Sequence, residues 1–206
     1  MSRNKSTAPS GVDKVVSEIH RLLRHKNPVL VALGGRSGTG KSTLAQAIAS
    51  RVQGRIVLGD DFYSGGNDDA WQGMSAAEKV EKGMDWQRMR TQVLEPLLAK
   101  KPASWHPLDF QPGIGWVGWK HETVILQPAP VILVDGVYSA RPELADLVDV
   151  AVLVWANDEE RRKRLDLREG QGFMQRWHAL WDAAEDYYFT QICPPSFFDL
   201  VVRTDE

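Results

Sequence analysis

The residues with the clearest chemical meaning lie in one glycine-rich segment between an apolar run and a helical pattern. The segment from Val29 to Thr43 reads VLVALGGRSGTGKST and contains the spacing Gly-x-x-x-x-Gly-Lys-Ser. Such glycines let consecutive backbone N–H groups converge on phosphate oxygens at the positive end of the following helix. The lysine then reaches the β- and γ-phosphates, and the hydroxyl after it ligates Mg²⁺. We therefore predict a site for ATP and Mg²⁺ built from Gly35, Ser37, Gly38, Thr39, Gly40, Lys41, Ser42 and Thr43.

Two acidic residues follow short β-like runs. The run 55–58 leads to Asp60, and the continuous apolar run 131–134 leads to Asp135. Because ligands collect at the carboxyl ends of parallel strands, both acids are expected beside the glycine-rich loop. Asp60 is predicted to accept the proton of an attacking hydroxyl during phosphoryl transfer. Asp135 is predicted to hold Mg²⁺ with Ser42, directly or through water.

A helix predicted over 158–169 carries a cluster of arginines. Arg161, Arg164 and Arg168 recur at i, i+3 and i+7 and therefore share one face. Arginines on one face can clamp the charge of a transferring phosphate, as a lid does. The alternative is a solvated basic face without a ligand.

The elements that must position these residues alternate between strands and helices. Apolar runs predict strands over 29–33, 55–58, 131–134, 149–155 and 198–202, and amphipathic patterns predict helices over 10–25, 41–52, 86–97, 158–169 and 173–191. This alternation favours one three-layer α/β domain over residues 1–206 rather than two domains. In it, 61–127 forms substrate-side insertions and 157–172 forms a lid.

The segment 100–128 is rich in Pro, Gly and Trp and suggests a β-hairpin over the active face. Trp105, Trp116 and Trp119 could stack on a flat substrate, or they could only pack the insertion against the body. The sequence pattern does not distinguish between substrate stacking and packing of the insertion.

Composition limits the classes of partner. The chain has 206 residues and a formal net charge of -2, so no basic field points to nucleic acid or to an acidic membrane. The N-terminus lacks the apolar stretch of a signal peptide, and we expect a cytoplasmic protein with a small-molecule substrate. A homo-oligomer is possible on the basis of the sequence. Cys193, the single cysteine, is expected to be a buried spectator.

Four motifs together resemble the uridine kinase-like family of P-loop kinases, which also covers phosphoribulokinase. They are GGRSGTGKST, GDDFY, VILVDGVYS and RRKRLDLREG, and the resemblance runs from about Val29 to Arg203. It implies a P-loop NTPase fold with a five-stranded parallel sheet in the order 2-3-1-4-5 and a lid helix.

The resemblance also implies roles for individual residues. Asp60 matches the catalytic Asp of the family, Asp85 resembles an Asp that contacts ribose hydroxyls, and Leu108-Asp109-Phe110 resembles a Tyr-Asp-Phe motif. The catalytic group would be Lys41, Asp60, Arg164 and Arg168, with Arg161 at the nucleotide. The substrate side would be Asp60, Tyr63, Asp85 and Asp109.

The expected activity is therefore ATP- and Mg²⁺-dependent phosphorylation of a hydroxyl on a small metabolite, first of all a nucleoside. Two alternatives stay open. One is a kinase for a non-nucleoside alcohol such as pantothenate or a sugar. The other is a nucleotide-binding regulatory module.

Overall fold

A five-stranded sheet lies at the centre of the computed structural model, which describes residues 10–66, 68–111, 115–169 and 180–205. Its strands, all parallel, are β1 (Val29–Gly34), β2 (Arg55–Leu58), β7 (Val131–Asp135), β8 (Val150–Trp155) and β9 (Leu200–Arg203). The observed order is β2-β7-β1-β8-β9, in a numbering that also counts the strands of the insertion. β1 and β7 are buried throughout, as continuous apolar strands covered on both faces should be.

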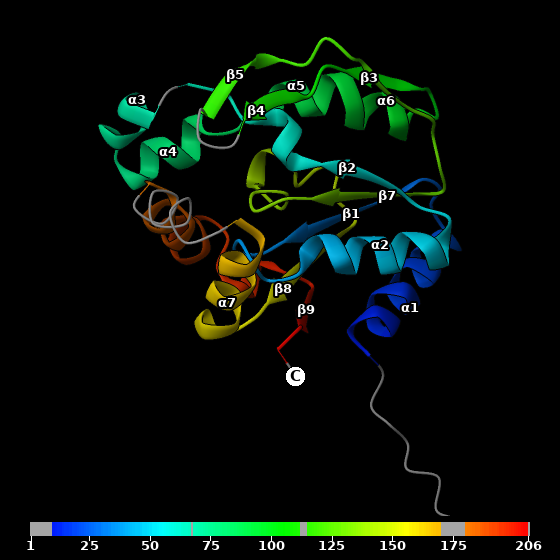
Figure 1. The fold of residues 1–206 in the computed structure, drawn as a ribbon. Coiled ribbons are helices and arrows are strands. Elements are labelled where there is room, and N and C mark those ends of the chain that lie inside the picture. The colour runs from blue at the N-terminus through cyan, green and yellow to red at the C-terminus, as the bar shows by residue number, and fades with distance from the viewer. Residues whose placement is uncertain (1–9, 67, 112–114, 170–179, 206) are drawn as a thin grey trace, which may run out of the picture.

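Helices cover both faces of this sheet (Figure 1). On one face, Val29, Val31 and Leu33 of β1 pack against α1 (Gly11–Leu23) and α2 (Lys41–Val52). On the other face, Leu30 and Ala32 belong to a larger apolar cluster. The alternation of these side chains along one strand follows from the period of two in β structure. The expected three-layer α/β arrangement is confirmed.

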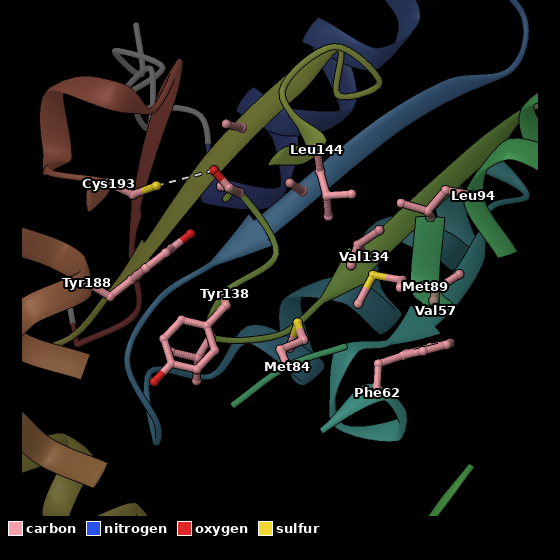
Figure 2. Packing of buried hydrophobic residues seen from close by; sticks show 14 of the residues in the cluster. Val57, Phe62, Met84, Met89, Leu94, Val134, Tyr138, Leu144, Tyr188 and Cys193 are labelled. Atoms are coloured by element: carbon pink, nitrogen blue, oxygen red, sulfur yellow. Dashed lines mark hydrogen bonds between the residues drawn. The ribbon is translucent and has the colours of Figure 1, made fainter. Parts of the chain in front are cut away.

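The second face is covered by a helical segment from the insertion and by the C-terminal helix. The first consists of α5 (Trp86–Met89), a π-helical turn η2 (Arg90–Leu94) and α6 (Glu95–Leu98). The second runs over 180–187 and continues as a π-helical turn η4 (Tyr188–Ile192). Figure 2 shows Phe62, Met84 and Met89 in this cluster together with Tyr138 and Tyr188, whose rings meet edge to face at 4.9 Å.

The rest of the insertion is built from short elements. It begins with a 3-10 turn η1 (Gly59–Phe62), followed by α3 (Asp68–Gln72) and α4 (Ala76–Lys82). Two antiparallel pairs follow, formed by β3 (Ala103–Trp105) with β6 (Val124–Leu126) and by β4 (Leu108–Gln111) with β5 (Gly115–Trp119). The expected β-hairpin in this segment is therefore present, as the β4–β5 pair.

The remaining elements complete the C-terminal half. They are a 3-10 turn η3 (Pro142–Leu144), the arginine-bearing helix α7 (Asp158–Glu169) and a 3-10 turn η5 (Pro195–Phe197). Asn157 caps α7 because its Oδ1 accepts a hydrogen bond from the N–H of Glu160 at 2.9 Å. The predicted lid segment 157–172 includes 170–172, and the predicted helix 173–191 includes 173–179; these stretches lie outside the described residues.

Cys193 is buried, as expected, and its thiol donates to the carbonyl oxygen of Ala140 at 3.3 Å (Figure 2). Burial raises the pKa of this thiol, which disfavours the reactive thiolate. None of the helices in the described part of the chain combines the length and apolar composition that a bilayer-spanning helix requires.

Candidate active site

The glycine-rich loop links β1 to α2, and its glycines are required by close backbone contacts. A Cβ on Gly35 would lie 2.2 Å from the carbonyl oxygen of Val154, and one on Gly38 would lie 2.7 Å from that of Arg161. Gly38 and Gly40 also have φ values of 80° and 87°, in the left-handed region that favours glycine. The loop is therefore pressed against β8 and α7, with a backbone path that other residues would strain.

Polar side chains of the loop and of the first turn of α2 gather at the N-terminal end of this helix. The buried Thr39 hydroxyl and the Lys41 ammonium both donate to the carbonyl oxygen of Arg36, at 2.9 and 3.0 Å. Ser42 and Thr43 are exposed at the N-terminus of α2, where backbone N–H groups have no intrahelical acceptor and attract anions. The residues predicted for the nucleotide phosphates are thus brought together at one helix end.

Asp135 and Asp60 meet at the carboxyl edge of the sheet. Asp135 is the last residue of β7 and is aligned with Leu33 of β1 on one side and Leu58 of β2 on the other. The chain leaving β2 then passes so close that a Cβ on Gly59 would lie 3.1 Å from the carbonyl oxygen of Asp135. The glycine before Asp60 therefore permits the close approach of the two acidic segments.

The pKa of Asp60 is raised by burial and adjusted by neighbouring charges. Its side chain keeps exposed surface, yet protein surrounds it closely enough that burial raises its pKa. The positive charges of Lys41 and Arg168 oppose this rise, whereas Asp135 adds to it. Burial likewise lowers the pKa of Lys41 and raises that of Tyr63. A raised pKa brings a carboxylate nearer to the range of an effective general base.

The three arginines predicted for the lid differ in their surroundings. Arg161 is buried and donates to the carbonyl oxygen of Ser37 at 2.8 Å and to Asp158 at 2.7 Å. Arg164 donates to Thr204 at 2.7 Å and to Glu160 at 3.0 Å. Both therefore brace the loop against α7 and the C-terminal strand. Arg168 is exposed, and its charge lowers the pKa of Asp60, so it faces the acidic side of the site.

The predicted substrate residues lie in the insertion and are more dispersed. Tyr63 is half-buried, with its ring 6.0 Å from that of Trp181. Asp85 caps α5 by accepting a hydrogen bond from the N–H of Arg88 at 2.9 Å. Asp109 lies on β4, opposite Gly118 at a bulge. The structure brings Tyr63 near Asp60, since the charge of Asp60 contributes to the raised pKa of Tyr63.

The tryptophans of the insertion have separate roles. Trp105 is buried, and its indole N–H donates to Asp61 at 2.9 Å, so it packs the insertion. Trp119 stays partly exposed and stacks on the guanidinium of Arg88, 4.1 Å from the ring centre. The side chain of Trp116 lies outside what the structure describes.

Two residues that were not predicted from the sequence hold parts of the candidate site together, one at the glycine-rich loop and one in the insertion. Glu185 is buried beside the loop, where it accepts hydrogen bonds from Ser37. Arg88 lies between the rings of Phe62 and Trp119 and donates to the carbonyl oxygens of Asp61 and His106. The only sequence signal for Glu185 was a charge among apolar positions of the expected helix 173–191. No feature of the sequence around Arg88 indicated its role.

A hollow on the outer face of α7 is separate from these residues. It has a volume of about 570 Å³ and is lined by Glu159, Arg162, Lys163, Asp166 and Leu167. None of these belongs to the predicted site.

Comparison with known proteins agrees with this geometry. A curated uridine kinase of Lactiplantibacillus plantarum is 29% identical over 156 residues, which cover 71% of each chain. A structure described as a possible uridine kinase from Bacillus stearothermophilus has a TM-score of 0.65 at 19% identity and covers 92% of this chain and 99% of its own. D-glycerate 3-kinase from Cryptococcus neoformans has a TM-score of 0.56 at 13% identity, with 86% and 90% covered.

A family model described as RNA helicase matches residues 31–102, a segment that contains the glycine-rich loop. This loop occurs in many nucleotide-binding proteins, so a local match does not carry over a whole function. The fold is that of the P-loop kinases. In sequence, the chain resembles the uridine kinases among them, as its motifs predicted.

Proposed function

We propose that the protein is an ATP- and Mg²⁺-dependent kinase that phosphorylates a hydroxyl of a small metabolite, with a nucleoside as the first candidate acceptor. The observation that carries this proposal is the position of Asp60 and Asp135 beside the P-loop at one edge of the sheet. Uridine kinases among the relatives support the acceptor class.

The donor side of the site fits Mg·ATP. The path of the loop requires glycine, because a Cβ at Gly35 or Gly38 would collide with neighbouring backbone. Ser42 and Asp135 would hold Mg²⁺, which neutralises phosphate charge when bound. Among the described residues no three His, Cys, Asp or Glu side chains are grouped to hold a metal, which suits an ion bound mainly by phosphates and water.

In the proposed mechanism, this chain's residues position charge and move one proton. Lys41 and the loop amides would orient the phosphates, and Asp60 would accept the proton of the acceptor hydroxyl as its oxygen attacks the γ-phosphorus. The bond from the γ-phosphorus to the β–γ bridging oxygen breaks in the same transfer, and ADP leaves with the electron pair. Arg168 faces Asp60 and would stabilise charge on the transferring group, with Arg164 and Arg161 bracing the loop. Tyr63, Asp85 and Asp109 would contact the acceptor.

A non-nucleoside alcohol is the second candidate acceptor. It is favoured by Leu108, which stands where nucleoside kinases of the resembled family have Tyr, and by the similar fold of D-glycerate 3-kinase. Asp109 keeps the carboxylate of that motif.

The test is ADP release from Mg·ATP with a panel of uridine, cytidine, nicotinamide riboside, pantothenate, ribulose 5-phosphate, D-glycerate and simple sugars. Stimulation by one class well above the rate in water supports the kinase and identifies the acceptor. Tight ATP binding with no stimulation, together with nucleotide-dependent binding of a protein partner, would favour a regulatory module instead.

A further inference from the structure

Glu185, on the helix over 180–187, places a carboxylate directly against the P-loop. Its side chain is 2% exposed. Oε1 accepts a hydrogen bond from the hydroxyl of Ser37 at 2.5 Å, and Oε2 accepts one from the N–H of Ser37 at 3.1 Å. An anion therefore occupies the first turn of a loop whose other amides are predicted to bind phosphate.

Basic groups converge on the same carboxylate. Arg161 lies 3.6 Å and Arg36 lies 3.7 Å from Oε2 of Glu185. Arg161 also donates to the carbonyl oxygen of Ser37 at 2.8 Å. Ser37 is thus held through its N–H and hydroxyl by Glu185 and through its C=O by Arg161, so the loop, α7 and the C-terminal helix meet at one residue.

A buried carboxylate is costly to retain unless it is paired. Its neighbours along the helix, Ala184 and Tyr188, are packed in the apolar cluster, and nothing in that packing requires a charge. Within the described part of the chain, the hydrogen-bond and ion-pair partners of Glu185 belong to the P-loop or to α7. The neighbouring Asp186 also pairs with the loop, through Arg36 at 2.8 Å, but its side chain is 61% exposed, and an exposed ion pair contributes little.

We propose that Glu185 is a positioning residue of the nucleotide site: it fixes the P-loop at Ser37 and aligns Arg161 with the loop. The proposal rests on the proposed function, because it assigns the loop to ATP. Glu185 acts through these residues and not on the phosphates themselves.

The test compares Glu185→Ala, Glu185→Gln and Ser37→Ala with Asp186→Asn as the matched control on the same helix. Glu185→Ala is expected to raise the Kd for Mg·ATP about tenfold or more in calorimetry and to leave the acceptor KM unchanged. Glu185→Gln, which keeps the shape and one acceptor oxygen, is expected to lose less, and Asp186→Asn is expected to change Kd less than twofold. Ser37→Ala and Glu185→Ala together are expected to be less than additive, because they share one interaction.

A second measurement needs no nucleotide. The N–H of Ser37, which donates to Glu185 at 3.1 Å, is expected to exchange with solvent deuterium faster in Glu185→Ala than in the wild type. Asp186→Asn is expected to leave this exchange rate unchanged.

The outcomes are separable. Wild-type affinity for Mg·ATP in Glu185→Ala, or an unchanged exchange rate of the Ser37 N–H in that variant, would overturn the positioning role. Failure of the wild-type protein to bind Mg·ATP would instead overturn the proposed function, and the exchange rate would still decide whether Glu185 fixes the loop at Ser37.

Discussion

The two sides of the candidate site are built by different means. On the nucleotide side, short hydrogen bonds fix the loop, with Thr204 donating to the carbonyl oxygen of Thr39 at 2.7 Å and Arg161 to that of Ser37 at 2.8 Å. On the acceptor side, short elements are joined by one arginine, Arg88, held between two rings and two carbonyl oxygens.

This difference indicates which side of the candidate site would determine phosphate binding and which would determine the choice of acceptor. Phosphate binding depends on backbone geometry, which tolerates little variation because a loop amide displaced by an ångström no longer reaches its oxygen. On the acceptor side, the antiparallel strand pairs and the short helices are joined through the side chain of Arg88, so the shape of this side can change with few substitutions while the phosphate site is kept. This arrangement suits a fold that serves several acceptors.

The largest effect is expected for Asp60→Asn, which removes the proposed base without changing its shape. Turnover should fall by roughly two or more orders of magnitude with the Kd for ATP little changed. Because the pKa of Asp60 is raised in the folded protein, wild-type activity should decline as pH falls through that raised value, at higher pH than for an ordinary aspartate. Steady-state rates against pH, with Asp61→Asn as the neighbouring control, check this.

The same substitution makes a stability prediction with a definite sign. A carboxyl whose folded pKa is raised disfavours the folded state while it is ionised, so Asp60→Asn should increase the free energy of unfolding at neutral pH. The gain should begin to decline as pH falls through the raised folded pKa of Asp60 and should vanish only below the ordinary pKa of an unfolded aspartate. Urea unfolding at several pH values measures it, and an unchanged or lowered stability at pH 7 would contradict the assigned environment.

A pair of glycines compares the two sides directly. Gly38→Ala places a Cβ 2.7 Å from a carbonyl oxygen at a φ of 80°, so it should raise the Kd for ATP by at least tenfold, in line with about 1–3 kcal/mol of backbone strain. Gly118→Ala, at a φ of 138° but with no atom within 4 Å of the added Cβ, should leave the Kd for ATP unchanged. Equal effects of the two substitutions on ATP binding would remove the contrast between the two sides.

Arg88→Met is expected to have a smaller effect, confined to the acceptor side. It keeps the length of the side chain but loses two hydrogen bonds and the contacts with two rings, worth about 1–3 kcal/mol in total. The acceptor KM should rise about tenfold while the Kd for ATP stays the same. Arg90→Met, which breaks a surface ion pair with Asp146, should change neither.

The smallest effect is expected at the helix caps. Ser75→Ala in α4 and Ser10→Ala in α1 each remove a capping box, at a cost of about 1 kcal/mol in the free energy of unfolding. Only Ser75→Ala, which lies in the insertion, should also change the acceptor KM. Urea unfolding and acceptor kinetics of both variants test this. If Ser10→Ala also changed the acceptor KM, the effect of Ser75→Ala would be explained by lost global stability and not by its place in the insertion.

Local patterns predicted the strands of the sheet and the helix that follows the glycine-rich loop. The strand over 55–58 and the helix over 41–52 were placed at their observed bounds, because continuous apolar runs and helical periodicity are short-range signals. The meeting of Asp60 with Asp135 was also expected, because parallel strands gather their carboxyl ends at one edge.

Contacts between residues distant in sequence were not predictable in this way. Ser37 and Glu185 are 148 positions apart, and no periodicity or spacing links them. The last strand begins at Leu200 rather than at Phe198, whose side chain instead packs in the apolar cluster near Gly34.

The single cysteine of the chain makes the protein convenient for distance measurements. Because Cys193 is buried, a cysteine introduced on the surface would react selectively with a spectroscopic label. Leu167 on α7 and Ile125 on β6 are 80% and 65% exposed, which makes them suitable positions for a pair of labels. The separation between the arginine-bearing helix and the insertion can therefore be followed in solution, with and without nucleotide, without first removing a native thiol.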